Sequence, residues 1–177
     1  MLVARVLAVS AAVMVLGACT TPAKDARYMA GHFRAQAELK TAAGESVGTA
    51  VAEQVDGRLR VMVEAHGLPK GAHGTHVHTT GKCEGPDFAS AGPHWNPTQH
   101  KHGKENPAGP HAGDMPNLSI GDDGRDRTIF MLPAGSYEGL LDEDGAALVI
   151  HAGADDYKTD PSGNSGGRIA CGVFQAM

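Results

Sequence analysis

The chain has 177 residues, of which 20% are charged and 41% hydrophobic, and its formal net charge is −5 at pH 7. This length and usage are typical of one globular domain. The acidic balance argues against a nucleic-acid partner and against a large basic field for membranes, while 24 glycines indicate many short turns.

The N-terminal segment has the pattern of an export signal. Residues 1–18 carry one basic residue and an apolar run that is too short to span a bilayer. The letters LGAC close it at Cys19 and resemble the bacterial lipobox, which predicts a lipidated N-terminus and a membrane-anchored protein of the periplasmic cell envelope. An ordinary signal peptide cut near Ala18 is the alternative. Residues 19–34 are predicted to be a tether, and residues 35–177 a single domain.

Short stretches of alternating apolar and polar residues predict strands along the rest of the chain. They cover His32–Lys40, Ser46–Val55, Arg58–His66, Leu118–Ile120, Thr128–Leu132 and Ile169–Phe174. Asp56-Gly57 between two of them is a strong hairpin signal. No stretch holds a helical period for three turns, so the pattern favours an antiparallel β-sandwich or barrel.

Histidines are concentrated in one segment, from Gly74 to Asp114, which holds six of the ten in the chain. Imidazole is the commonest metal ligand, so this density predicts a metal site. His76 and His78 alternate with other residues in a strand-like stretch, and residues two apart on a strand face the same side, about 6.6 Å apart. His94 follows within a turn-forming sequence, GPHWNP.

Donor types divide the candidates into two sets. Three imidazoles and a carboxylate suit tetrahedral zinc, whereas an all-imidazole set suits copper. The zinc candidates are His94, His102, His111 and Asp114. The copper candidates are His76, His78, His94 and one more histidine, for which His151 at the end of an apolar run is proposed. An imidazolate has two nitrogens and can bridge two metals, so His94 is placed in both sets.

The motifs around these residues form one series along the chain. They are H-x-H, G-P-H-x-N-P, a histidine eight residues later, H-x-x-D nine beyond that, V-I-H and a closing G-R-I-A-C-G-V. From about Ala35 to the C-terminus the chain resembles a bacterial secreted Cu/Zn superoxide dismutase. The resemblance implies an all-β, Greek-key antiparallel barrel or sandwich of the immunoglobulin-like kind, with long metal-binding loops.

The same resemblance implies a reaction and its cofactors. One copper and one zinc per chain would convert two superoxide anions and two protons into dioxygen and hydrogen peroxide, in two half-reactions that reduce and reoxidise the copper. His94 would carry a proton between the half-reactions, while zinc keeps its ring oriented. The expected role in the cell is protection of the envelope from superoxide.

Further residues take roles by their position in the resemblance. Asp155 would link a copper ligand, His76, to a zinc ligand, His102, because metal-bound imidazoles usually donate their other N–H to a carboxylate or carbonyl. The neighbouring Asp156 is treated as an ordinary loop residue. Arg168 would attract and orient the small anionic substrate.

Three cysteines are an odd number for an exported chain. Lipidation of Cys19 would remove one, leaving Cys83 and Cys171 to pair. Unpaired cysteines are the alternative, which an oxidising compartment disfavours.

Several histidines have no assigned role. These are His32, His66, His73 and His100. His100 stands two residues before His102, and spacing alone favours His102 as the zinc ligand, with an exchange of the two left open. Lys158 is expected to be solvated.

Two other functions compete with catalysis. One is a binding protein that buffers copper and zinc, and the other is an envelope lipoprotein that zinc merely stabilises. The presence of both His94 and Arg168, without a methionine cluster of soft donors, favours the enzyme. The oligomeric state stays open between a monomer and a homodimer.

Overall fold

Alternation of apolar and polar side chains sets most of the strands. The computed structural model describes residues 33–177. Its strands are β1 (Arg34–Lys40), β2 (Ser46–Val55), β3 (Arg58–His66), β4 (Gly71–His73), β5 (Thr75–His78), β6 (Leu118–Ile120), β7 (Arg125–Met131), β8 (Ala147–His151), β9 (Arg168–Val173) and β10 (Gln175–Ala176). One 3-10 turn, η1 (Ala89–Ala91), and one short helix, α2 (Tyr137–Leu140), interrupt the loops.

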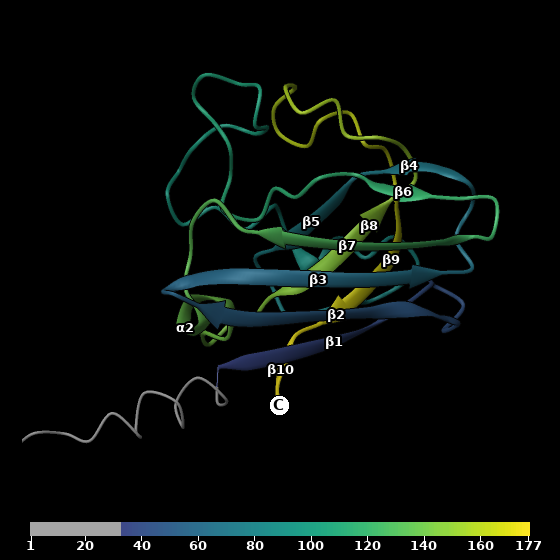
Figure 1. Ribbon diagram of the computed structural model, residues 1–177, viewed down its shortest axis with the longest axis horizontal. Helices are drawn as coiled ribbons and strands as arrows, with labels where there is room; N and C mark the ends of the chain where they lie inside the picture. Colours follow the sequence, from purple (N-terminus) through teal and green to yellow (C-terminus); the bar gives the residue numbers. More distant parts are fainter. Residues whose placement is uncertain (1–32) are drawn as a thin grey trace, which may run out of the picture.

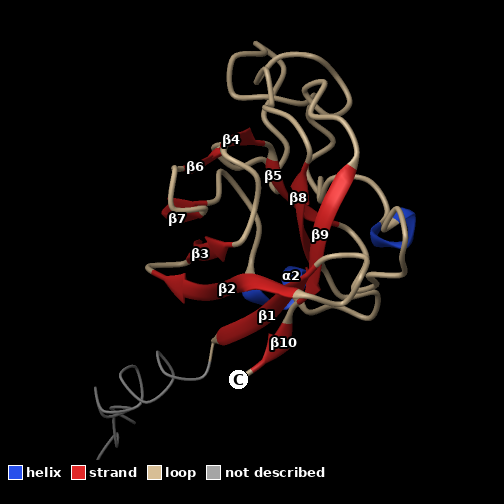
Figure 2. Cartoon of the chain, turned by 90° about the vertical axis from the view of Figure 1, so that its right-hand side faces the viewer, coloured by secondary structure: helices blue, strands red, loops and turns tan. Residues whose placement is uncertain are grey.

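The strands form one curled antiparallel sheet. Its order is β5-β8-β9-β1-β2-β3-β7, with β10 paired to β1, and β4 pairs with β6 in a small second sheet. Figure 2 shows the large sheet bending round until β4 and β6 lie across its open side. The chain crosses between distant strands after β3 and again after β7, as a Greek key requires. The predicted all-β fold is therefore confirmed.

The core fills the inside of this curl. In β1, Ala35, Ala37 and Leu39 point inward and alternate with exposed residues. β8 differs because all five of its residues are buried. Its Leu148 and Ile150 join the main core, while its other face packs against the loop that contains η1. Strand β8 is therefore covered on both faces up to its last residue, His151.

Some boundaries differ from those expected. The first strand begins at Arg34, and His32 lies outside the described residues. β7 begins three residues earlier than predicted, because the register pairs Arg125 with His66 although Arg125–Arg127 looks like a charged turn. The sequence gives no signal for β4, β10 or α2, since each is too short to show a period.

The disulfide between Cys83 and Cys171 is present, as predicted. It joins the loop after β5 to β9 across 88 positions of the chain. In a chain-entropy treatment, closing a loop of this length stabilises the fold by roughly 4 to 5 kcal/mol at most. Its local effect is to hold the segment around η1 against the outer face of β8.

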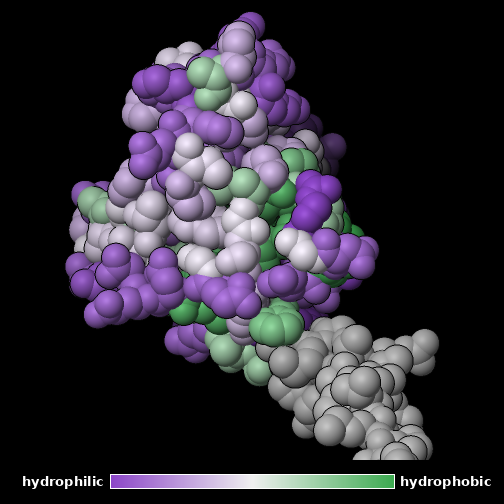
Figure 3. Space-filling model, turned by 90° about the vertical axis from the view of Figure 1, so that its left-hand side faces the viewer, coloured by the Kyte–Doolittle hydropathy of each residue, from purple (hydrophilic) through white to green (hydrophobic). Residues whose placement is uncertain are grey.

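Two long loops stand at one end of the barrel. The first comprises residues 79–117 and the second residues 152–167, and Figures 1 and 2 both show them side by side above the strands. Figure 3 shows that the surface at this end is mostly hydrophilic. The first loop buries Phe88, Trp95 and Met115, whereas the buried residues of the second loop are polar or glycine, so polar contacts must order much of both loops.

The expected signal peptide, tether and Cys19 lie outside the described residues. Among residues 33–177, no helix is long and apolar enough to cross a membrane.

Candidate metal centre

Four histidines meet under the two long loops. β5 supplies His76 and His78, and the adjacent β8 ends in His151. His94 belongs to the first long loop and pairs with His78 through an isolated antiparallel β-bridge. All four are buried, and one nitrogen of each lies within 4.8 Å of the others. The structure therefore brings the predicted copper candidates together.

Each of these rings has one nitrogen that is held by the protein or faces the second group. His76 Nε2 donates to Asp155 Oδ2 at 2.7 Å. The Nδ1 atoms of His78 and His151 donate to the carbonyls of Gly92 and Gly166, at 2.8 and 3.1 Å respectively. His94 Nδ1 lies 3.0 Å from Asp114 Oδ1. The opposite nitrogens have no partner among the described residues, although all four are buried. Buried polar atoms without partners are costly, so four that converge fit a bound cation.

The protonation states agree with this interpretation. Burial lowers the pKa of His76 to about 3, that of His78 to about 2 and that of His151 to about 4. Burial also lowers the pKa of His94. The rings are therefore neutral at pH 7, and each keeps a lone pair for a metal. An all-imidazole set of this kind suits copper.

A second group forms on the other side of His94. Asp114 Oδ1 lies 3.0 Å from Nδ1 of His94, 3.1 Å from Nδ1 of His102 and 3.2 Å from Nδ1 of His111, and the Nδ1 atoms of His94 and His111 are 3.4 Å apart. Zinc bonds of 2.0–2.1 Å in a tetrahedron place the donor atoms about 3.3 Å from one another. The spacing and the donor types both fit zinc.

The ring of His76 lies close to this second group, because it stacks on His94 at 3.9 Å between centroids. Its Nε2 is already bonded to Asp155, so His111 is the better fourth member. His102 is fully buried within the group, whereas His100 is exposed. The alternative in which His100 takes the place of His102 in this group is therefore not supported.

Asp155 connects the two groups. Its Oδ2 accepts from His76 Nε2 at 2.7 Å, and its Oδ1 accepts from His102 Nε2 at 3.0 Å. Burial would raise the pKa of Asp155, but the hydrogen bonds from His102 and His76 hold it below its usual range. The carboxylate is therefore ionised and fixes two rings, one in each group, as expected from the resemblance.

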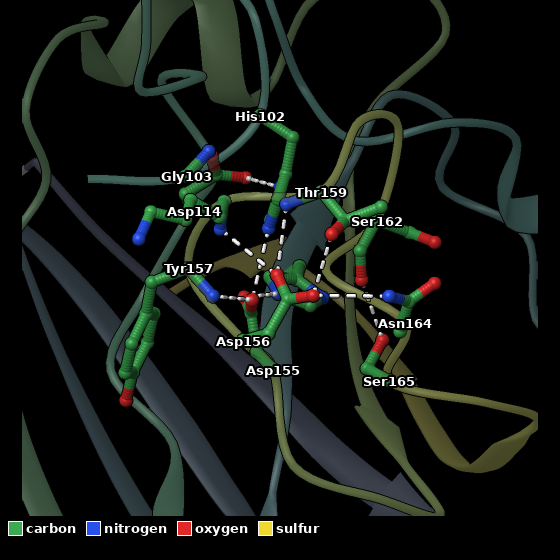
Figure 4. A network of polar contacts seen from close by, with 12 residues as sticks. His102, Gly103, Asp114, Asp155, Asp156, Tyr157, Thr159, Ser162, Asn164 and Ser165 are labelled. Carbon is green, nitrogen blue, oxygen red and sulfur yellow. Dashed lines mark hydrogen bonds and ion pairs between the residues drawn. The ribbon is translucent and has the colours of Figure 1, made fainter. Parts of the chain in front are cut away.

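The neighbouring Asp156 is more than an ordinary loop residue. Its Oδ1 accepts from the backbone N–H groups of Lys158 and Thr159, and its Oδ2 accepts from Thr159 Oγ1 and Asn164 Nδ2. Figure 4 shows this network beside Asp155 in the second long loop. Asp156 thus gives the loop a fixed shape. Only the Asx-turn tendency of aspartate could have indicated it in the sequence.

His73 is a second residue that sequence reasoning missed. It is 3% exposed, and its Nδ1 and Nε2 lie 2.7 Å from the His151 carbonyl and 2.8 Å from the Pro69 carbonyl. It thereby ties the end of β8 to the loop before β4. No period or motif in the sequence distinguishes it from a solvent-exposed histidine.

Arg168 lies in a cavity that opens on the first group. The cavity has a volume of about 420 Å³, and His78, His94 and His151 share its lining with Arg168. The guanidinium donates to the Phe88 carbonyl at 2.6 Å and to the Gly92 carbonyl at 2.7 Å. The loop pinned by the disulfide thus holds a positive charge at the site. Lys158 does not line this cavity and lies 3.8 Å from Glu105.

Comparison with known proteins gives one family. A family model described as copper/zinc superoxide dismutase matches residues 46–174. The chain is 45% identical over 153 residues to Cu-Zn superoxide dismutase 1 of Aquifex aeolicus, covering 83% of this chain and 90% of that protein. It is 45% identical over 149 residues to the superoxide dismutase-like protein YojM of Bacillus subtilis, covering 80% and 76%. The crystal structure of a double mutant of a SOD-like protein from Bacillus subtilis superposes with a TM-score of 0.73 at 44% identity, covering 78% and 95%.

The network around Asp155 predicts the effect of Gly163→Ala. A Cβ at Gly163 would collide with Asp155 Oδ1 and come within 2.7 Å of His102 Nε2. We expect zinc affinity to fall by about tenfold or more, as losses of such outer contacts do. The measurement is zinc retained during dialysis against a graded chelator.

Gly67→Ala is the matched control, because Gly67 has φ of +67°, close to the +63° of Gly163, but open space around it. Equal zinc retention by the two variants would show that Asp155 does not organise the centre.

Proposed function

The chain belongs to the Cu/Zn superoxide dismutase family, and from this premise we propose which residues hold each metal and where in the cell the protein works. It is an oxidoreductase that uses copper and zinc to convert superoxide into dioxygen and hydrogen peroxide. We assign copper to His76, His78, His94 and His151, and zinc to His94, His102, His111 and Asp114. The supporting observation is the convergence of four buried imidazole nitrogens that have no partner among residues 33–177, beside a second group in which Asp114 Oδ1 lies 3.0–3.2 Å from Nδ1 of His94, His102 and His111.

His94 is the residue through which the two metals act together. When bound, copper would supply alternating one-electron oxidation and reduction of superoxide, and Nδ1 of His94 would be one of the ligands of zinc. Between the half-reactions His94 would hold a proton at Nε2 and would give it to the departing peroxide, as one of the two protons that hydrogen peroxide contains. Its ring keeps its direction meanwhile, because Asp114 lies 3.0 Å from Nδ1 and His76 stacks against its face.

Arg168 guides the substrate in this scheme. Superoxide is a small anion, and the protein as a whole carries a formal net charge of −5. A guanidinium that lines the same cavity as three of the copper histidines gives this one place a local positive field. Its two backbone acceptors keep the charge at the cavity wall, where an arriving anion meets it before the metal.

The envelope role rests on the N-terminal sequence. The short apolar run, the letters LGAC and an even number of remaining cysteines support an exported lipoprotein anchored through Cys19. The disulfide also agrees with an oxidising compartment. In that location the enzyme would remove superoxide within the cell envelope.

Metal removal and replacement test the catalytic assignment. We expect the protein with both metals to dismutate superoxide, the copper-free protein to be inactive, and copper alone to restore only part of the activity. The measurements are metal content and superoxide decay on the same samples. A protein that holds one copper and one zinc yet dismutates no faster than free copper would contradict the proposal.

Replacement of Arg168 separates substrate guidance from metal binding. Arg168→Ala should lower kcat/KM by about tenfold and flatten its dependence on ionic strength, because the lost charge contributes to association rather than chemistry. Copper and zinc contents should not change. Arg127→Ala is the control. It removes an exposed arginine of β7 that pairs with Glu64 of β3, and it should keep the wild-type rate. Equal rates in both variants would reject the guiding role.

Mass spectrometry tests the anchor. In the membrane fraction of an expressing bacterium we expect a mature chain that begins at Cys19 and carries diacylglycerol on its sulfur. The Cys19→Ser variant should no longer be found in the membrane fraction, and its dismutase domain should stay active. A wild-type chain that is soluble and begins at another residue would exclude the lipoprotein assignment.

A further inference from the structure

A second cavity lies on the zinc side of His94. It has a volume of about 300 Å³ and is lined by His94, His111 and the unassigned His100, among others. It shares only Pro93, His94 and Pro161 with the larger cavity that contains Arg168. The ring of His94 and the two prolines therefore separate two openings. The zinc group has a cavity of its own, distinct from the one that receives substrate.

Hydrogen bonds fix both the backbone and the ring of His100, although this residue belongs to neither group. Its backbone N–H donates to Asn96 Oδ1 at 3.1 Å, and its carbonyl accepts from Asn96 Nδ2 at 2.8 Å. Its ring Nδ1 lies 3.2 Å from the carbonyl oxygen of Pro110, which can only accept a hydrogen bond. A hydrogen on Nδ1 would complete this contact, and Nε2 is the ring nitrogen that the contact does not use.

The same arrangement occurs at two of the copper candidates. His78 and His151 each donate from Nδ1 to a backbone carbonyl and leave Nε2 free. In metalloproteins this kind of hydrogen bond sets the tautomer and the direction of a ligating imidazole. His100 shares the Nδ1 contact to a carbonyl but is exposed to solvent and belongs to neither group of converging ligand atoms.

The charges around the second cavity suit a cation. Lys101 and Asp160 both line it, and they form an ion pair of 2.9 Å. Asp160 Oδ1 also accepts from the backbone N–H of His102 at 2.8 Å, so the pair joins the two long loops. The lysine charge is thus neutralised where a divalent ion would pass. Asp114, behind the histidines, supplies the negative charge toward which the ion would move.

We propose that this cavity is the route by which zinc reaches and leaves its site, and that Nε2 of His100 binds the ion at the cavity mouth before it passes to His111 and His94. The proposal rests on the zinc ligands assigned above. A ligand at the mouth lets zinc exchange its water molecules for imidazoles one at a time, so the ion is never left without donors.

Zinc release from the loaded enzyme tests this role. The protein with both metals is mixed with excess of a chelating dye, and the absorbance of the zinc–dye complex gives the release rate. The route is the same in both directions, so His100→Ala should slow release by about tenfold, which corresponds to roughly 1.4 kcal/mol of barrier height. Uptake of Co²⁺ by the zinc-free full chain, followed by its visible absorption, should slow by the same factor, with the same final occupancy.

Two variants serve as controls. His66→Ala removes a histidine at the end of β3, away from both cavities, and should leave the rates unchanged. His100→Asp replaces one ligand with another and should restore most of the lost rate. A purely structural role for His100 would not be rescued by aspartate.

The outcomes separate the route from the ligand assignment. An unchanged release rate in His100→Ala overturns the route. A faster release rate also overturns it, because that result would mean that His100 only retains bound zinc and does not help it to leave. If the wild-type chain binds Co²⁺ without the intense absorption of a tetrahedral site, the zinc ligand set fails and the route fails with it. A normal cobalt spectrum with unaltered kinetics overturns the route alone.

Discussion

The centre depends on how each buried imidazole divides its two nitrogens. At His76, His78 and His151, one nitrogen is fixed by a carboxylate or a backbone carbonyl, and the other has no partner among residues 33–177. Burial keeps the rings neutral, so the free nitrogens are lone-pair donors rather than charges that repel one another. The unpaired atoms would destabilise the fold if no ion bound there. Stability and catalysis therefore use the same set of atoms.

The long loops follow from this arrangement. The second loop buries no large apolar side chain, and ionised carboxylates that accept several hydrogen bonds each set much of its shape and its contact with the first. Asp155 joins a ring of one group to a ring of the other, Asp156 closes the second loop on itself, and Asp160 ties it to the first. On the opposite side, the Gly92 carbonyl accepts from both His78 and Arg168. The positions of the Arg168 guanidinium and of the His78 ring are thus set by one peptide group.

Much of this could be predicted from the sequence. Alternation located β2 and β3 to the residue, and donor types sorted the histidines into two sets whose members the structure brings close together, with His76 near both. β7 was placed late because a run of charged residues hid its first half. Asp155 needed the resemblance to a family, since one acidic residue in a loop has no distinguishing pattern. His73 and Asp156 could not be found, because their roles depend on carbonyls and side chains brought near only by folding.

The two groups differ in how much chain must be made before they can form. The zinc group is contained in residues 94–114, a single loop, while the copper group needs residues from 76 to 151 and the strand pairing of β5 with β8. Closing the shorter segment loses less entropy. The zinc candidates can therefore be brought together at a smaller entropic cost than the copper candidates, whose approach also needs two strands to pair.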